Sequence, residues 1–300
     1  MKQPGLLDEK PTSTEARSRQ ILLDQYLNFG LRKVDGWLDS FSAKFIQIVS
    51  ETQFREGITG ALGEIGVHQG KLFIVLLLTA SSTEALFAVD LFERQDLNLD
   101  RSGCGDREKF LGNLQRWART TEKISLIAQS SLETRPEDIL TACGRVRLAS
   151  IDGGHTEACT QNDLTLMETV LTDRGVVVID DFFNPHWPDV STGVAKYLLN
   201  PSSTLRPFAI SPNKMYLTAS QNSEFYRNAI EKKLAIDKTS VMFGADVDIY
   251  GLPEPEQNIK WLAKECMKQS AFGPYLLAAK RFAQAACVRH RTMAKLLSQY

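Results

Sequence analysis

The sequence predicts an α/β protein with a Rossmann-like, doubly wound, mostly parallel seven-stranded sheet and helical N- and C-terminal extensions. From Gly60 onward, short apolar runs alternate with amphipathic stretches of helical spacing. A strand–helix–strand order of this kind is typical of a parallel sheet that is covered by helices on both faces. Connections of this length also predict right-handed crossovers.

The N-terminal residues differ from this pattern. Residues 1–18 are polar, and we expect a flexible tail there. Residues 19–59 carry apolar positions at helical spacing and predict a helical extension, interrupted near Gly30 and Gly36. This extension could cover a sheet edge or contribute to a homodimer contact.

The predicted Rossmann-like domain spans residues 60–250. Its first five strands are expected at 61–65, 86–89, 124–128, 146–151 and 176–179. The helices between them are expected at 71–80, 107–120, 135–142 and 161–172. The later elements are expected as a helix at 191–199, strands at 205–210, 214–219 and 247–250, and a C-terminal helical segment at 251–300.

The composition narrows the class of function. The net charge is -1 and the charged fraction is 24%, so no basic field favours nucleic acid. Five scattered cysteines without CxxC spacing suit reduced thiols in a cytoplasmic protein. The apolar runs are too short to span a bilayer, and the N-terminus lacks a secretory signal core. We therefore expect a cytoplasmic protein with a small-molecule partner and with neither a nucleic-acid nor a membrane partner.

The first candidate site is the glycine turn after the first strand. In an open parallel sheet, ligands bind beyond the carboxyl ends of the strands. The turn contains Glu64, Gly66, Val67 and Gly70 in G-x-x-x-G spacing, whereas nicotinamide enzymes use G-x-G-x-x-G. Glycine lets the backbone approach a ligand closely, so these four residues are candidate cofactor-binding residues. A tight strand–helix turn without a ligand would use the same residues.

Two further candidate residues follow the second and third strands. Asp90 lies 24 residues after Gly66, where dinucleotide and nucleoside folds place an acid that accepts hydrogen bonds from ribose hydroxyls. Capping of a helix is the structural alternative for this residue. Ser131 follows the third strand at the same rim.

Three aspartates at the ends of the fourth and fifth strands form the sharpest pattern. Asp152, Asp180 and Asp181 offer hard oxygen ligands of the kind that Mg²⁺ prefers. Without a cation such a cluster would repel itself and raise some of its pKa values. The alternative is that Asp180 and Asp181 cap the next loop.

His155, three residues after Asp152, is the candidate general base, with a structural role as its alternative. Aromatic residues and a proline that could wall an acceptor pocket follow the acidic pair: Phe182, Phe183, Trp187 and Pro188.

Together these motifs resemble class I S-adenosylmethionine-dependent methyltransferases over roughly residues 55–220. The similarity is closest to bacterial sugar and natural-product O-methyltransferases of the macrocin type, and catechol-type O-methyltransferases share the site pattern. The most specific part is the IDGGH motif ending at His155, followed about 28 residues later by IDD. Catechol-type enzymes have a lysine at the place of His155, and macrocin-type enzymes often have an acid at the place of Gly154.

The resemblance implies a role for each candidate residue. Glu64, Gly66 and Gly70 would hold the methionine end of S-adenosylmethionine, Asp90 the ribose, and Ser131 would lie near the adenine. The implied metal ligands are Asp152, Asp180 and Asp181, for Mg²⁺ or another divalent cation. The implied reaction is methylation of a hydroxyl on a small molecule or sugar.

Three other functions remain open from the residues alone. They are a nicotinamide-dependent oxidoreductase on the same fold, a non-catalytic cofactor-binding module, and a metal-dependent hydrolase that uses the aspartates. The spacing of the glycine turn argues against the first and its cofactor-like form against the last.

Overall fold

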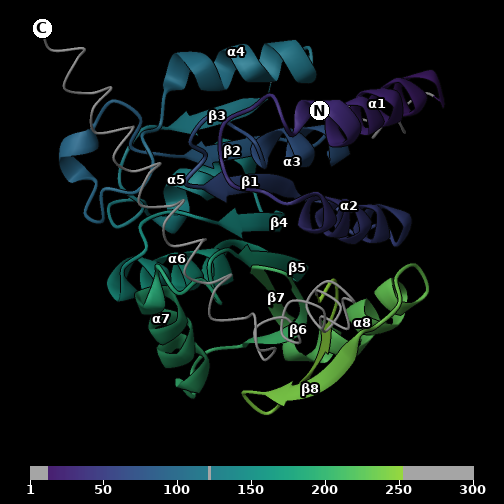
Figure 1. Ribbon diagram of the computed structural model, residues 1–300, viewed down its shortest axis with the longest axis vertical. Helices are drawn as coiled ribbons and strands as arrows, with labels where there is room; N and C mark the ends of the chain where they lie inside the picture. The colour runs from purple at the N-terminus through teal and green to yellow at the C-terminus, as the bar shows by residue number, and fades with distance from the viewer. Residues whose placement is uncertain (1–12, 121–122, 253–300) are drawn as a thin grey trace, which may run out of the picture. The chain divides into compact units, whose positions relative to one another are not determined.

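The structure, a computed structural model, describes residues 13–120 and 123–252. These residues form one nine-stranded sheet with helices on both faces (Figure 1). The strand order is β3-β2-β1-β4-β5-β7-β6-β9-β8. The predicted fold class is confirmed, and the predicted number of seven strands is too low.

The strands of the sheet are β1 (Ala61–Ile65), β2 (Leu86–Val89), β3 (Ile124–Ile127), β4 (Val146–Ile151), β5 (Leu171–Ile179), β6 (Leu205–Ser211), β7 (Lys214–Ala219), β8 (Lys238–Met242) and β9 (Ala245–Ile249). The five strands from β3 to β5 in the sheet order are parallel to one another. β7 runs antiparallel between β5 and β6. β9 is parallel to β6 and antiparallel to β8. The sheet is therefore mostly parallel on the side where the predicted ligand rim lies.

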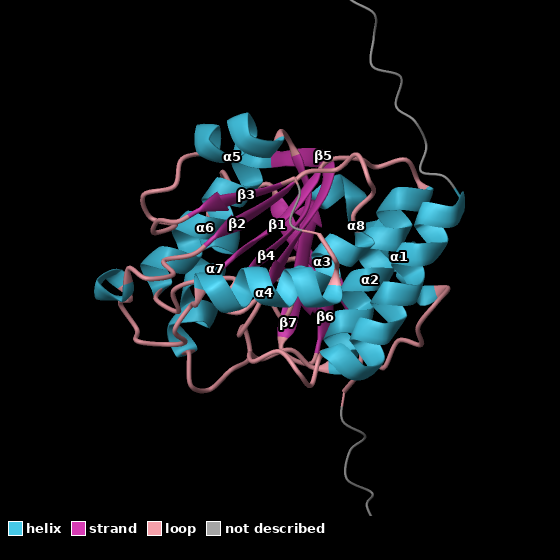
Figure 2. Cartoon of the chain, turned by 90° about the horizontal axis from the view of Figure 1, so that it is seen from above, coloured by secondary structure: helices cyan, strands magenta, loops and turns pink. Residues whose placement is uncertain are grey.

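The helices of the described residues are α1 (Ser13–Gln25), the π-helical turn η1 (Tyr26–Gly30), α2 (Ser40–Arg55), α3 (Phe73–Thr79), η2 (Gln95–Leu97), α4 (Arg107–Trp117), α5 (Pro136–Cys143), α6 (Glu157–Val170), α7 (Pro188–Leu199), η3 (Ser220–Asn222) and α8 (Ser223–Glu231). Seen from above, α1, α2 and α3 lie on one side of the sheet and α5, α6 and α7 on the other (Figure 2).

Alternating side chains of the strands supply a separate hydrophobic core on each face. Val176 and Val178 of β5 pack toward one core, whereas Val177 and Ile179 pack toward the other. Successive side chains of a strand point to opposite faces, so a strand covered on both sides is apolar at most positions. This requirement explains why the central strands appear in the sequence as largely apolar runs.

The main difference from the prediction is at the C-terminal edge of the sheet. Only a strand at 247–250 is expected there, whereas the structure has a β8–β9 hairpin and the additional helix α8. Phe243 and Gly244 both have positive φ, the backbone form of a tight two-residue hairpin turn. β5 also begins at Leu171, so the preceding helix ends earlier than predicted.

The N-terminal extension is helical and interrupted as predicted. η1 ends at Gly30, and Gly36, with φ +131°, lies in the connection to α2. Asp39 begins α2 as its N-cap by accepting a hydrogen bond from the Ser42 backbone N–H. Residues 13–18 belong to α1 and not to the predicted tail, while residues 1–12 of that tail and 253–300 of the C-terminal segment lie outside the described residues. Among the described helices, none has the length and apolar character to cross a membrane.

Candidate active site

A cavity of about 740 Å³ lies at the carboxyl ends of the parallel strands. Gly66, Asp90, Ser131 and Asp152, predicted from four different strand ends, all line it. The volume is within the range of small-molecule binding pockets. The residues at this rim thus share one enclosed space, as the strand-end argument predicts.

The predicted residues Glu64, Val67 and Gly70 are not among those that line the cavity. Glu64 and Val67 are buried, and a side chain at Gly70 would press against the Phe110 ring at 2.9 Å. The structure therefore gives Val67 and Gly70 a packing role beneath the cavity wall. Glu64 keeps one carboxylate oxygen, Oε2, buried without a hydrogen-bond partner.

Gly66 lies where the backbone after β1 comes very close to the backbone after β4, and this approach requires glycine. Its φ is +83°, and a Cβ at this position would stand 1.9 Å from the carbonyl oxygen of Asp152. No other residue fits here without moving the end of β1 away from the end of β4. The glycine thus brings the first turn and the IDGGH motif into contact at the cavity.

Asp90 is held by backbone N–H groups at the end of β2. Its Oδ2 accepts from the His68 N–H at 2.9 Å, and its Oδ1 accepts from the Phe92 N–H at 2.7 Å. Burial raises the pKa of Asp90, and these N–H groups partly offset that effect. A Cβ at Gly105 would stand 2.4 Å from Oδ1, so the loop after β2 folds back directly over the carboxylate.

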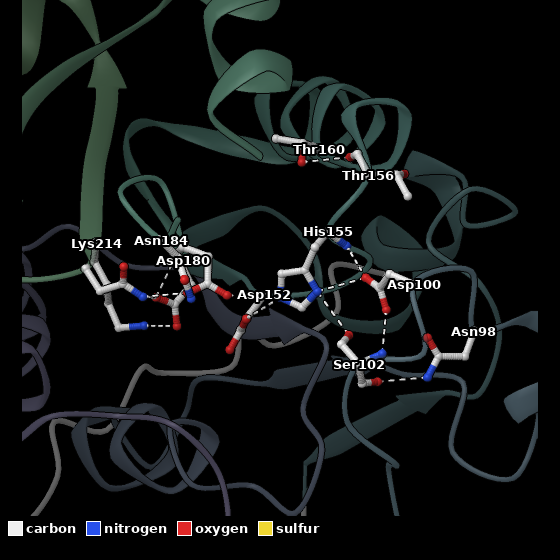
Figure 3. Close-up of polar contacts among 12 residues, drawn as sticks. Asn98, Asp100, Ser102, Asp152, His155, Thr156, Thr160, Asp180, Asn184 and Lys214 are labelled. Carbon is white, nitrogen blue, oxygen red and sulfur yellow. Dashed lines mark hydrogen bonds and ion pairs between the residues drawn. The ribbon is translucent and has the colours of Figure 1, made fainter. Parts of the chain in front are cut away.

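Three side chains of the rim converge on one point of the cavity. His155 Nε2 lies 3.0 Å from Asp181 Oδ2 and 3.7 Å from Asp152 Oδ1. The side chains come from the segments that follow β4 and β5, and those of Asp152 and His155 point toward each other (Figure 3). Asp181 has φ +60°, a backbone form that aspartate tolerates better than most residues. One potential metal ligand atom from each of the three lies within 4.8 Å of the other two.

Asp180 does not belong to this group. Its Oδ2 is paired with Lys214 Nζ, and its Oδ1 accepts from the Asn213 side chain at 3.1 Å and from the Asp181 N–H at 2.9 Å. The carboxylate is buried and both of its oxygens have partners. Among the described residues, the cluster of potential metal ligands therefore contains Asp152, Asp181 and His155, and the prediction that Asp180 binds a metal stays untested.

Two charged residues at this rim were not predicted from the sequence. Asp100 comes from the long loop after β2, and Lys214 is the first residue of β7. Asp100 Oδ2 lies 2.8 Å from His155 Nδ1 and accepts from the His155 backbone N–H at 2.5 Å. Neither residue has a local sequence signal, because Asp100 reaches His155 and Lys214 reaches Asp180 only through the tertiary fold.

The aromatic residues after the acidic pair are divided between the cavity and the core. Trp187 lines the cavity and stacks on the His155 ring, with ring centroids 4.4 Å apart and an interplanar angle of 19°. Phe182 is buried in the core, and Phe183 is 49% exposed. His186 also lines the cavity. The expectation of an aromatic wall therefore applies to Trp187 alone among the three aromatic residues.

The charges of the cluster are strongly coupled. Burial and the neighbouring Asp180 raise the pKa of Asp152 to about 7. Burial opposes a charge on His155, but hydrogen bonds to Asp152 and Asp181 outweigh burial and raise its pKa to about 10. Burial also disfavours the Asp181 charge, yet hydrogen bonds from His155, Asn184 and Asn213 lower its pKa to about 2. The metal-free cluster therefore attracts a cation at the point where His155 Nε2 lies.

The comparison with sequence families identifies the domain that contains the site. Residues 64–182 match the family described as a methyltransferase domain. Residues 64–182 therefore form a methyltransferase domain. The match begins at Glu64 and ends at Phe182, so it contains every candidate cofactor-binding, metal-binding and catalytic residue predicted from the sequence. A search of curated proteins found no match.

Solved structures similar to this chain are O-methyltransferases or other methyltransferases at low sequence identity, and NovP supports the assigned fold. The O-methyltransferase NovP is 16% identical, with a TM-score of 0.51, over 59% of this chain and 79% of that one. The calicheamicin methyltransferase CalS11 is 16% identical, with a TM-score of 0.46, over 73% of this chain and 98% of that one. An O-methyltransferase from Bacillus cereus, solved in complex with SAH, is 13% identical, with a TM-score of 0.45, over 69% and 92%.

Proposed function

We propose that this methyltransferase transfers the methyl group of S-adenosylmethionine to a hydroxyl of a small molecule or sugar, with a divalent metal in the site and residues 60–250 as the catalytic domain. The observation that carries the proposal is the position of the Asp152–His155–Asp181 cluster. It opens into the same cavity as Asp90, the candidate ribose ligand. A cofactor and an acceptor hydroxyl beside the cluster would therefore share one cavity.

The cofactor would lie along the wall formed by the first four strand ends. Asp90 would accept hydrogen bonds from the ribose, Ser131 would lie near the adenine, and the backbone at Gly66 leaves room for close approach. Asp152 would face the methionine end. The surplus of carboxylates at this rim favours a cationic sulfonium, because opposite charges attract strongly where water is largely excluded.

A divalent cation fits the donor atoms that the cluster presents. Asp181 Oδ1 is engaged by the amide groups of Asn184 and Asn213, at 2.9 Å and 2.6 Å, which leaves Oδ2 facing the cluster. Asp152 supplies a second carboxylate oxygen. A bound cation would stabilise negative charge on the acceptor oxygen and lower the pKa of its hydroxyl.

In the reaction, the acceptor oxygen forms a bond to the methyl carbon while the bond from that carbon to sulfur breaks. The sulfonium becomes a neutral thioether, and the hydroxyl proton leaves toward the cluster. Asp152, whose Oδ1 lies 3.7 Å from His155 Nε2, would take up this proton. In the metal-free protein His155 already holds a proton at neutral pH, so the predicted base role requires that proton to be displaced first.

Calorimetric titration with S-adenosylmethionine tests the cofactor assignment. We expect Asp90→Asn to weaken binding roughly tenfold or more, since a hydrogen bond to a charged acceptor contributes about 1.5–3 kcal/mol. Asp96→Asn is the matched control, because Asp96 is 65% exposed in the loop after the same strand. Equal binding by the wild type and Asp90→Asn, or tighter binding of a nicotinamide dinucleotide, would overturn the assignment.

Methyl transfer is tested by release of S-adenosylhomocysteine with a panel of sugar and aromatic hydroxyl acceptors, with and without added Mn²⁺. We expect turnover only with metal, and loss of turnover in Asp181→Asn. Cofactor binding without metal binding or turnover on any acceptor would instead indicate a non-catalytic binding module.

A further inference from the structure

The His155 ring is fixed from two sides. Its Nδ1 lies 2.8 Å from Asp100 Oδ2 and 3.0 Å from the Ser102 hydroxyl, and its face stacks on Trp187. The side chain is only 11% exposed. Because Nδ1 is occupied, the nitrogen that remains for a ligand in the cavity is Nε2 (Figure 3).

The contacts of Nε2 have the spacing of ligands around one metal ion. Nε2 lies 3.0 Å from Asp181 Oδ2 and 3.7 Å from Asp152 Oδ1. Two ligands at right angles with metal bonds of about 2.1 Å are about 3.0 Å apart, and wider angles give larger separations. The three atoms could therefore bind one cation after small movements of the side chains.

Asp180 is not available as a ligand of the same ion, because its oxygens already have partners. Lys214, Asn213 and the Asp181 N–H already occupy its two oxygens. Lys214 is buried, and its pKa is raised because attraction to Asp180 and Asp152 outweighs burial. A metal that recruited Asp180 would have to separate this buried pair, which costs several kcal/mol.

The contact between Asp100 and His155 completes the pattern of a metal-bound histidine. Such a histidine almost always donates its second ring N–H to a carboxylate or carbonyl, which fixes the tautomer and the orientation of the ring. Asp100 supplies that carboxylate, and it also accepts the Ser102 backbone N–H at 2.7 Å through Oδ1. The loop after β2 therefore contributes a carboxylate that orients the His155 ring, at a site built mainly from the ends of β4 and β5.

We propose that the metal of this methyltransferase is bound by Asp152, Asp181 and His155 Nε2, that Asp100 positions the imidazole, and that the site prefers a first-row transition metal such as Mn²⁺ to Mg²⁺. This rests on the proposed function, since it concerns the metal of the same active site. Imidazole suits transition metals, whereas Mg²⁺ is held almost entirely by oxygen.

Metal affinities of the tag-free full-length protein test the ligand set. Mn²⁺ and Mg²⁺ are titrated separately by calorimetry. We expect wild type to bind Mn²⁺ at least about tenfold more tightly than Mg²⁺ and expect His155→Gln to abolish that difference. Asp181→Asn should weaken both ions about tenfold or more, and Asp180→Asn should change neither by more than about threefold. Equal affinity of the wild type for the two ions, or a loss in Asp180→Asn as large as in Asp181→Asn, would overturn the proposal.

Pulsed electron paramagnetic resonance of the Mn²⁺-loaded protein tests the histidine directly. The wild type should show nitrogen couplings from a bound imidazole, and His155→Gln should lose them. His186→Gln is the matched control, because His186 lines the same cavity outside the proposed set, and it should keep them. If the couplings persist in His155→Gln or disappear in His186→Gln, His155 is not the ligand.

The positioning role of Asp100 has its own readout. Asp100→Asn should weaken Mn²⁺ about 10- to 100-fold and change the couplings of the remote imidazole nitrogen, while Asp96→Asn should do neither. Unchanged Mn²⁺ affinity and couplings in Asp100→Asn would refute that role. Titration of each variant with S-adenosylmethionine separates the two proposals. If the cofactor binds but the metal affinities differ from those expected above, only this inference is overturned. If the wild type does not bind the cofactor, the proposed function is overturned.

Discussion

Replacing Lys214 with methionine should reveal how much the acidic rim depends on an internal cation. Lys214 Nζ is paired with Asp180, and its side chain is only 2% exposed. It also attracts Glu64 and Asp152. Burial raises the pKa of both carboxyl groups, and the charge of Lys214 opposes that rise. Lys214→Met keeps most of the side-chain volume and removes the charge, so the buried Asp180 carboxylate loses its partner.

The expected cost is about 3–5 kcal/mol, the usual result of removing one partner of a buried ion pair. That is a large part of the roughly 5–15 kcal/mol by which a typical domain is stable. The assay is urea unfolding of metal-free protein in EDTA. Lys196→Met is the matched control, because Lys196 forms a 2.6 Å pair with Glu157 but is 56% exposed, and it should cost less than about 1 kcal/mol.

A double-mutant cycle with Asp180→Asn shows whether the cost comes from the unpaired carboxylate. The double variant should recover most of the stability lost in Lys214→Met, because no buried charge is then left without a partner. A loss below about 1 kcal/mol in Lys214→Met, or no recovery in the double variant, would refute the reasoning and mean that water reaches Asp180.

Two further predictions concern the glycine turn and a buried carboxylate behind the cavity. Gly66→Ala should weaken S-adenosylmethionine binding about tenfold or more, because its Cβ would overlap the Asp152 carbonyl. Gly57→Ala, which has φ +67° but no atom within 4 Å of its Cβ, should leave the affinity unchanged; equal affinities for both variants would contradict the close-approach argument. Burial raises the pKa of Asp163 from 3.8 to about 6, so the folded protein holds this proton to higher pH than the unfolded chain does. Stability should therefore fall as the pH rises from about 4 to 6, and relative to wild type Asp163→Asn should gain up to about 3 kcal/mol across that window. Urea unfolding at pH 4.5 and 7.5 measures the gain, and a stability difference that does not change with pH would show that Asp163 is not perturbed.

The sequence by itself determined the central sheet and most of its rim. Strands buried on both faces are largely apolar, so β1, β2, β4 and β7 could be predicted with the bounds that the structure has. Parallel strands share one carboxyl edge, which brought Gly66, Asp90, Ser131 and Asp152 to one cavity. These are local patterns combined with one topological rule, and neither depends on side-chain contacts between distant segments.

Only the tertiary structure decided which charges meet. Asp180 and Asp181 are adjacent in sequence and equivalent as ligands, yet Lys214 occupies the first and His155 faces the second. Asp100 reaches His155 from a loop 55 residues away. The β8–β9 hairpin was missed in part because its outer strand is half exposed and lacks an apolar run. Ion pairs and loop contacts depend on distances of a few ångströms between remote segments, because the electrostatic energy depends on separation and burial, which the order of residues does not contain.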